Sequence, residues 1–164
     1  MKRQISLLFF VLCYISCLAQ IYIEPVYNEK LDAALKDDSI AEYYTSINEL
    51  DSAIYYKSKV LDVYSQIYEE SDTLYTDCIF DMACLHFDAQ HYKTAISLFE
   101  TIDKLQDKYN MYTAWGYSTL LAHLSLSYVY LESYAQAIQI CEKILALKKN
   151  GSSDKCIVNQ QINE

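Results

Sequence analysis

The stretch Tyr92-Lys93-Thr94-Ala95-Ile96 decides the fold, because a similar stretch occurs twice more at a fixed distance along the chain. Leu50-Asp51-Ser52-Ala53-Ile54 precedes it by 42 residues, and Tyr134-Ala135-Gln136-Ala137-Ile138 follows it by the same 42 residues. A fixed period of this length indicates an array of similar structural units, so we interpret the chain as a repeat before assigning single elements.

The flanking residues keep the same register on both sides of the repeated stretch. Upstream lie Ile40-Ala41 with Tyr44, Met82-Ala83 with His86, and Leu124-Ser125 with Tyr128, while Val60, Ile102 and Ile144 coincide downstream. Each unit thus has small residues where one helix crosses another, with large apolar residues at i, i+3 and i+4 spacing around them. Two glycines and one proline are too few to end the many short strands of a sandwich or barrel, so we expect an all-α fold.

Six helices follow from this apolar spacing and from the polar corners that separate the segments. The corners are residues 46–49, 88–91 and 130–133, and Ser71-Asp72-Thr73 is a helix start signal. We expect helices at about 31–45, 50–68, 73–87, 92–107, 111–129 and 134–148, the last of them stopped by Asn150-Gly151.

The residues that carry the register resemble the signature of the tetratricopeptide repeat (TPR), in the 42-residue form found in kinesin light chain. They are Ala41, Ala53, Ala83, Tyr92, Ala95, Tyr128, Tyr134 and Ala137. The first unit departs from the family pattern, because Asp37 and Lys57 stand where large apolar residues are usual and Leu50 replaces a tyrosine. The family's late proline is also missing, and an unrelated array of helical hairpins is the alternative interpretation.

The resemblance implies a right-handed superhelical solenoid of about three hairpins, at about 31–70, 71–110 and 111–149. One hairpin cannot bury both of its apolar faces alone, so neighbouring units would stabilise one another. Residues 150–164 are interpreted as a short C-terminal cap helix or, alternatively, as the start of a truncated fourth repeat.

Residues 1–19 have the features of a secretory signal peptide. A basic start precedes an apolar run of 14 residues, from 5 to 18, whereas a membrane-spanning helix needs roughly 20. We expect cleavage after Ala19 and an extended lead-in over residues 20–30. The alternatives are a lipoprotein cut that leaves a lipid-modified Cys17 and an uncleaved N-terminal anchor. The chain is thus expected to be exported, to the periplasm or cell envelope.

The charge of the chain limits the classes of partner. Removing residues 1–19 takes away two of the 13 basic residues and none of the 22 acidic ones, which leaves a net charge of 11 − 22 = −11. Such an acidic chain is not expected to bind nucleic acid. Arg3 is the only arginine, so the expected mature chain lacks the bidentate group that binds phosphates and carboxylates. A membrane would be reached only through the N-terminus.

The TPR resemblance places the partner-binding groove on a concave face lined by the first helix of each unit. The positions it marks are Asp38, Glu42 and Thr45 in unit one, Asp77, Phe80, Cys84, Phe87 and Asp88 in unit two, and Ala122, Leu126, Val129 and Tyr130 in unit three. Such a groove is acidic at one end and apolar and aromatic at the other, so a basic or apolar-aromatic segment is the expected ligand. The alternative is that Phe80, Phe87 and Leu126 pack the interior of the array instead.

The histidines and cysteines raise the alternatives of a zinc site and of a cysteine nucleophile. Cys78, Cys84, His86 and His91 are zinc-ligand types, but six residues of helix separate the first two by about 9 Å along the axis, on different faces. Cys84 with His123 could form a nucleophile and base, yet no orienting group or oxyanion-binding turn accompanies them. We therefore expect no metal, no cofactor and no catalytic residue.

Export would permit disulfides among the four cysteines that remain after residue 19. Buried free thiols are the default expectation, and the alternative is a bridge between Cys141 and Cys156 that would pin the C-terminal cap to the last long helix.

The function predicted from the sequence is that of an exported, non-enzymatic scaffold for protein–protein interaction, which binds a peptide or helix in its groove. A second hypothesis is a sensor or regulatory N-terminal fragment of a larger envelope signalling protein. A third, less favoured hypothesis is a cysteine-dependent hydrolase that uses Cys84.

Overall fold

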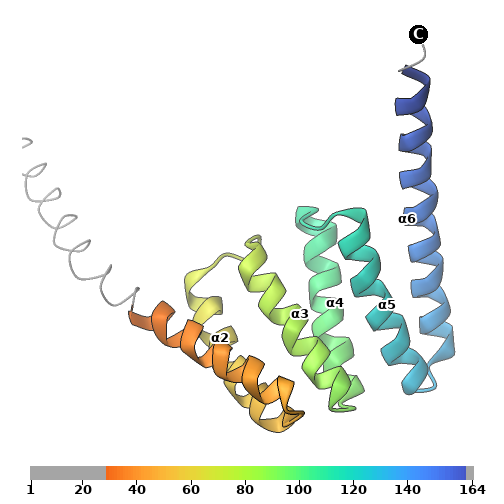
Figure 1. The fold of residues 1–164 in the computed structure, drawn as a ribbon. Coiled ribbons are helices and arrows are strands. Elements are labelled where there is room, and N and C mark those ends of the chain that lie inside the picture. Colours follow the sequence, from red (N-terminus) through yellow and green to blue (C-terminus); the bar gives the residue numbers. More distant parts are fainter. Residues whose placement is uncertain (1–28, 162–164) are drawn as a thin grey trace, which may run out of the picture.

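The computed structural model describes residues 29–161, and every regular element in this range is a helix (Figure 1). Residues 29–46 form the first helix, followed by α2 (Leu50–Ile67), α3 (Thr73–Asp88), α4 (Tyr92–Tyr109), α5 (Ala114–Tyr130) and α6 (Tyr134–Gln161). The expected all-α fold of sequential hairpins is thus confirmed. The predicted signal peptide at 1–19 lies outside the described residues, as does the lead-in up to residue 28.

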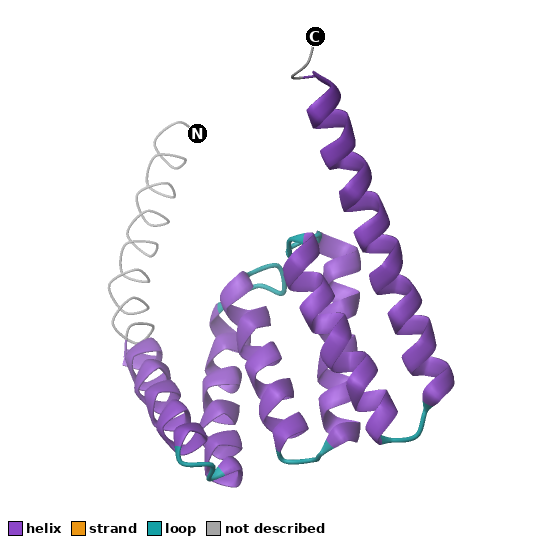
Figure 2. Cartoon of the chain, turned by 45° about the vertical axis from the view of Figure 1, so that its right-hand side comes forward, coloured by secondary structure: helices purple, strands orange, loops and turns teal. Residues whose placement is uncertain are grey.

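The hairpins stand side by side in chain order, with the first described helix and α6 at opposite ends of the row (Figure 2). Each helix from α2 onward packs against the next one, and α3 also touches α5. In Figure 1 helix 29–46, α3 and α5 lie in front, with α2 and α4 behind them. The first helices of the three units therefore share one side of the molecule.

The repeated alanines are buried in the packed array. Ala53 and Ala95 are fully buried, and Ala137 is 5% exposed. Ala41 and Ala83 on the first helices of units one and two are buried as well. A methyl side chain allows two helix backbones to approach closely, and a larger one would force them apart. The 42-residue period therefore reflects helix packing that recurs in each unit.

The three corners within the hairpins share one backbone conformation, which also repeats every 42 residues. Asn48, Gln90 and Glu132 have φ values of 60°, 62° and 57°, in the left-handed region. At each corner the amide of the next residue donates to the carbonyl five positions earlier, as in the 2.9 Å bond from Glu49 to Tyr44. This is the Schellman arrangement that satisfies the last carbonyls of a helix. The corner geometry recurs although none of the three residues is glycine.

The largest part of the core lies between the second and third hairpins. Ile79 and Ala83 of α3 pack with Phe99 and Ile102 of α4 and with a buried row on α5 that includes Leu121. A smaller cluster joins the first helix to α2 and α3, through Ala34, Val60, Tyr64 and Cys78. The expected start signal at Asp72 is confirmed, because its side chain accepts a 2.8 Å hydrogen bond from the Leu74 amide.

Several helix boundaries differ from those expected, and three of the differences have a clear consequence or cause. Residues 29 and 30 belong to the first helix rather than to a lead-in, and α5 begins at Ala114 because Thr113 caps it by accepting from the Gly116 amide. The stop predicted at Asn150-Gly151 is wrong, since α6 continues to Gln161 and includes residues 150–161 that were assigned to a separate cap. One glycine costs a helix only about 1 kcal/mol, which does not end it.

The continuity of α6 also changes the interpretation of its cysteines. Cys141 is exposed and free. Cys156 lies on the same helix, and its separation from Cys141 corresponds to about 22 Å along the axis. A Cys141–Cys156 bridge, considered as a possibility above, does not form in this structure, because a disulfide needs its two Cα atoms within roughly 7 Å.

Candidate functional site

Two of the hollows in the described part of the chain are lined largely by residues of the first helices of the units and of the loop before α5. The larger one, about 400 Å³, is called the acidic hollow; it is lined by Glu42, Thr45, Ser46, Lys57, Asp81, Cys84, Leu85 and Asp88. The smaller one, about 180 Å³, is called the aromatic hollow; it is lined by Asp77, Phe80, Tyr112, Gly116, Thr119 and Leu120. Because α3 contributes to both, the two hollows are consecutive along the row of helices.

The acidic hollow holds three carboxylates and one lysine. Glu42, on the first helix, and Asp88, at the end of α3, are both exposed. Asp81 of α3, whose side chain is 55% exposed, accepts from the Lys57 ammonium at 3.0 Å. The charge of Lys57 is therefore already engaged, which leaves the hollow with a surplus of negative charge.

Lys57 comes from α2 and is 6% exposed, an unusual position for a lysine. Its Nζ atom lies 2.5 Å from Asp38 on the first helix and 3.0 Å from Asp81 on α3. Burial lowers the pKa of Lys57, but the hydrogen bonds and charges of Asp38 and Asp81 outweigh that effect and raise the pKa above its usual value. Three helices are thus joined at one buried ammonium group.

The 42-residue register shows what replaces this ion triad in the next unit. Moving Asp38, Lys57 and Asp81 forward by one period leads to Phe80, Phe99 and His123. These three rings pack together with centroid separations of 5.7 to 5.8 Å. The same space between consecutive units is therefore filled by an ion triad in one place and by an aromatic triad in the other.

The aromatic hollow is shaped by Tyr112, in the loop before α5. Its hydroxyl donates to Asp77 at 3.2 Å. Burial raises the pKa of Tyr112 to about 12 and raises that of the Asp77 carboxyl as well. The phenol consequently stays protonated at neutral pH and remains a donor to Asp77.

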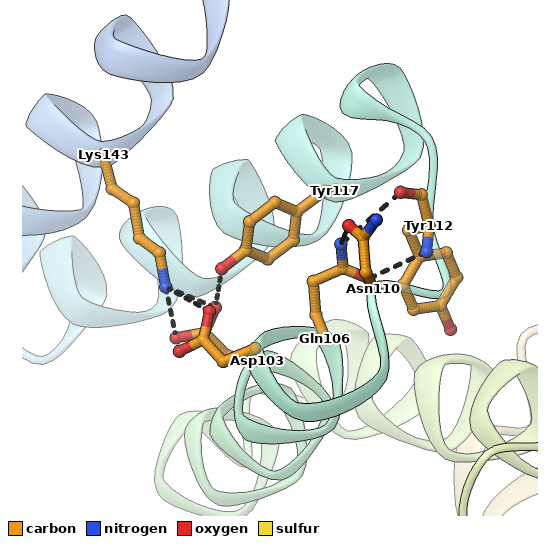
Figure 3. Close-up of polar contacts among 7 residues, drawn as sticks. Asp103, Gln106, Asn110, Tyr112, Tyr117 and Lys143 are labelled. Carbon is orange, nitrogen blue, oxygen red and sulfur yellow. Dashed lines mark hydrogen bonds and ion pairs between the residues drawn. The ribbon is translucent and has the colours of Figure 1, made fainter.

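Gln106 of α4 holds the loop that carries Tyr112 (Figure 3). Its side-chain oxygen accepts from the Tyr112 amide at 2.7 Å, and its amide group donates to Asn110 at 3.2 Å and to the Tyr112 carbonyl at 3.4 Å. Gln106 is buried, so these bonds are shielded from water. The position of the hollow's aromatic wall is thus fixed from the core.

A second polar contact in Figure 3 ties α6 to the rest of the array. The Lys143 ammonium lies 2.9 and 3.1 Å from the two carboxylate oxygens of Asp103 on α4, and the Tyr117 hydroxyl of α5 donates to the same carboxylate. Burial raises the pKa of Tyr117, as does its bond to Asp103. This group joins the second helices of the last two units across α5.

Beyond the hollows an aromatic corner is formed by Phe87, Tyr92 and Tyr130. The rings of Tyr92 and Tyr130 stack at 4.7 Å between centroids, and Phe87 meets Tyr130 edge-on at 5.7 Å. Tyr130 keeps 54% of its surface exposed, so the corner presents an aromatic face to solvent.

The structure distributes the predicted groove residues over these features. Glu42, Cys84 and Asp88 line the acidic hollow, and Asp77 and Phe80 line the aromatic hollow. Phe87 and Tyr130 form the aromatic corner. Asp38 is paired with Lys57, and Leu126 is exposed on α5 outside both hollows. Phe80 and Phe87 are half-buried; Phe80 packs on Phe99 and also lines the aromatic hollow, whereas Phe87 packs against Tyr92 and Tyr130. Leu126 is 42% exposed and does not pack the interior.

Sequence reasoning missed several residues that line the hollows, and the most informative of them are Lys57, Asp81 and Tyr112. A signal existed for Lys57, because it breaks the apolar pattern at a position where the next unit has Phe99. A charged residue at such a position requires a charged partner. Tyr112 stands in a loop, where the period carries no information.

The chemistry of the cysteines and histidines does not point to catalysis. Burial raises the pKa of Cys84 to about 12, so the thiol is protonated at neutral pH, whereas a nucleophile needs a thiolate. His86 faces His91 with 3.4 Å between their Nδ1 atoms. Burial lowers the pKa of His86, and the charge of His91 lowers it further. In the part of the chain that the structure describes, no group of three metal-ligand side chains is arranged to hold an ion.

None of the described helices is long and apolar enough to cross a membrane.

The fold is similar to solved structures of helical repeat proteins. The nearly identical TPR-like repeats assigned to a kinesin light chain of Podosopora anserina match with a TM-score of 0.64 and 13% identity, over 71% of this chain and 56% of theirs. A second crystal structure, of a variant of the same repeats, gives a TM-score of 0.62 and 12% identity, over 73% and 57%. The N-terminal domain of stress-induced protein-1 (STI-1) from C. elegans matches with a TM-score of 0.57 and 10% identity, over 72% and 86%.

These comparisons show the fold, a TPR-like helical repeat. The chain spans little more than half of the kinesin light chain structures. No protein-family model matches the sequence, and no curated protein matches it closely enough to count as a relative.

Proposed function

We propose that this chain is a non-enzymatic scaffold that binds an extended peptide or helix of another protein along the two hollows. The ligand carries a lysine or arginine that enters the acidic hollow and an apolar or aromatic side chain that reaches the aromatic hollow. TPR-like domains typically mediate protein–protein interaction, which supports the general class. The specific chemistry is supported by the residues that line the hollows.

The observation that carries the proposal is the surplus charge of the acidic hollow. Glu42, Asp81 and Asp88 line it, and the one lysine among its lining residues is already paired with Asp38 and Asp81. A cationic side chain from a partner would meet unpaired carboxylates there, at a partly enclosed site where charges are screened less than on an open surface. The aromatic hollow offers the ring of Phe80 to the next side chains of the same partner.

Binding of synthetic peptides tests this proposal. Fluorescently labelled peptides that combine lysines with a tryptophan or phenylalanine are titrated with the purified chain, alongside peptides in which glutamate replaces lysine or serine replaces the aromatic residue. We expect affinity only when both features are present, and affinity that falls as ionic strength rises. Equal binding of the glutamate-substituted peptides would contradict the proposal.

Two charge-matched double variants locate the binding surface. Glu42→Gln with Asp88→Asn removes two exposed carboxylates from the acidic hollow, and we expect affinity to fall roughly 3- to 20-fold, the sum of two partly screened ion pairs. Asp62→Asn with Glu142→Gln removes two exposed carboxylates from α2 and α6, outside both hollows, and is expected to leave affinity unchanged. Equal loss in the two double variants would place binding elsewhere.

We further propose that the protein acts outside the cytoplasm, in the periplasm or at the cell envelope. This rests on the basic start and apolar run of residues 1–19. Intact mass spectrometry of the protein from its native cells tests it. A chain beginning at residue 20, or a lipid-bearing Cys17, supports export, and an intact Met1 in a soluble cytoplasmic fraction would contradict it.

A further inference from the structure

The interfaces between consecutive units follow one rule, in which the first helix of the next unit covers the second helix of the unit before it. On α2 the covered position is Lys57, which meets Asp81 of α3. On α4 the equivalent position is Phe99, which meets His123 of α5. The next equivalent position is Cys141 on α6, and it is exposed.

The whole stripe around Cys141 is uncovered in the same way. Ile138 is 59% exposed, whereas its equivalent Ile96 on α4 is 9% exposed. Tyr134 and Leu145 keep 58% and 65% of their surface exposed. With Cys141 these residues lie along one side of a helix, and we call this stripe the C-terminal face.

The opposite end of the array carries the complementary half of the same interface. Tyr43 is 60% exposed on the first helix, whereas its equivalent in α3, Leu85, is 6% exposed. Ile47, one turn later, is 49% exposed. Together with Ser39, the equivalent of Asp81, these residues form what we call the N-terminal face.

We propose that copies of this chain associate head to tail, with the N-terminal face of one copy seated on the C-terminal face of the next. The occupant is a second copy because the two faces are the two halves of an interface that the chain already builds twice within itself. In that register Ser39 lies opposite Cys141, as Asp81 lies opposite Lys57 and His123 opposite Phe99. Both halves carry large apolar side chains, Tyr43 and Ile47 on one and Ile138 and Leu145 on the other. The contact is heterologous, so each added copy leaves one face of each kind free.

A mixing experiment with two variants tests the proposal. In sedimentation equilibrium the mass of the wild-type chain is expected to rise with concentration beyond that of a dimer. Tyr43→Lys blocks only the N-terminal face and Ile138→Lys only the C-terminal face, so each variant alone is expected to remain monomeric. Their equimolar mixture retains one intact pair of faces and is expected to form dimers that do not grow further.

The control variant is Tyr55→Lys. Tyr55 is 58% exposed on α2, and its equivalents Ser97 and Gln139 are exposed too, so no internal interface uses this position. It is expected to associate as the wild type does, and circular dichroism verifies that every variant is helical. A wild-type chain that stays monomeric at its highest soluble concentration would overturn the proposal. Association in which the two face variants fail to form dimers on mixing would overturn it as well.

Cross-linking tests the register of the contact. A short bis-maleimide is expected to join Ser39→Cys of one copy to the native Cys141 of the next and to produce a ladder of linked chains. Burial raises the pKa values of Cys78 and Cys84 to about 12, so these thiols react slowly. Ser97→Cys, equally exposed on α4, is the matched control and is expected to give no ladder. A ladder of equal yield from Ser97→Cys, or none from Ser39→Cys, would contradict the proposed register.

Discussion

Replacing Lys57 with methionine is expected to destabilise the array more than the same replacement of Lys59, the other lysine of α2. The methionine side chain keeps most of the buried stem of the lysine, so the change isolates the loss of the ammonium group. That group joins Asp38 on the first helix to Asp81 on α3, at 2.5 and 3.0 Å. Without it, two carboxylates face each other across the interface between the first two units.

The size of the effect follows from how far the triad is buried. Removing one partner of a fully buried ion pair costs about 3–5 kcal/mol, because the remaining charge is left without compensation. Here the side chains of Asp38 and Asp81 are 28% and 55% exposed, so water can solvate part of both carboxylates. We therefore expect the free energy of unfolding to fall by about 2–3 kcal/mol, below the fully buried limit.

Urea unfolding followed by far-UV circular dichroism measures this loss. The control is Lys59→Met, two residues further along α2, where the lysine is 44% exposed and pairs with Asp37 at 3.2 Å. That exposed pair is worth about 0.2–1 kcal/mol. If the two variants were equally stable, Lys57 would not be a buried link between three helices, and our account of the first interface would be refuted.

The 42-residue register also suggests a triple variant that should restore the stability lost in Lys57→Met. Asp38→Phe, Lys57→Phe and Asp81→His together transplant the aromatic triad of Phe80, Phe99 and His123 into the first interface. Well-packed apolar groups often replace a buried ion group at no cost, so we expect this triple variant to be at least as stable as the wild type. A triple variant less stable than Lys57→Met would show that the two interfaces are not equivalent.

Three further predictions concern the repeat and its titration. Ala95→Leu overpacks a fully buried crossing and is expected to lower the free energy of unfolding by about 2–3 kcal/mol in urea, whereas Ala135→Leu on the exposed side of α6 leaves it nearly unchanged. Gln90→Gly removes the strain of a left-handed residue and is expected to raise the free energy of unfolding by about 0.5–1 kcal/mol. Asn48→Gly is expected to raise it by less, because asparagine adopts this conformation more readily. Equal gains from the two variants, or a loss of stability in either, would contradict the corner geometry. The folded-state pKa of Lys57 is raised, so its stabilisation is complete below the unfolded-state pKa of about 10.4 and is lost as pH rises toward the folded value. The difference in unfolding free energy between wild type and Lys57→Met should therefore narrow above that pH and stay constant from there down to neutral pH.

The sequence period predicted the helices and hairpins well because it reports contacts that every unit must make. Ala53, Ala95 and Ala137 have to be small at each crossing, and the polar corners fall one after another at the same spacing. Asp72 marks the start of α3 by its capping chemistry alone. These are local or repeated constraints, and one chain displays them several times.

The features that could not be predicted depend on single, non-repeated contacts. Lys57 needs one partner from the helix before it and one from the helix after it, and the spacing of one helix cannot reveal either. Tyr112 is placed by Gln106 in a loop whose residues do not repeat, since the equivalent position one period earlier is Glu70. The end of α6 was misjudged because Gly151 has the chemistry of a helix stop but lies within a helical segment.

Zero-length cross-linking with a carbodiimide tests the binding role of the groove most directly. A bound peptide with a single lysine next to an aromatic residue would be coupled to the carboxylates that its ammonium group touches, and mass spectrometry would identify them. We predict coupling to Glu42, Asp81 or Asp88 in the acidic hollow. Coupling mainly to Asp62 on α2 or Glu142 on α6 would contradict it, because those carboxylates lie outside both hollows.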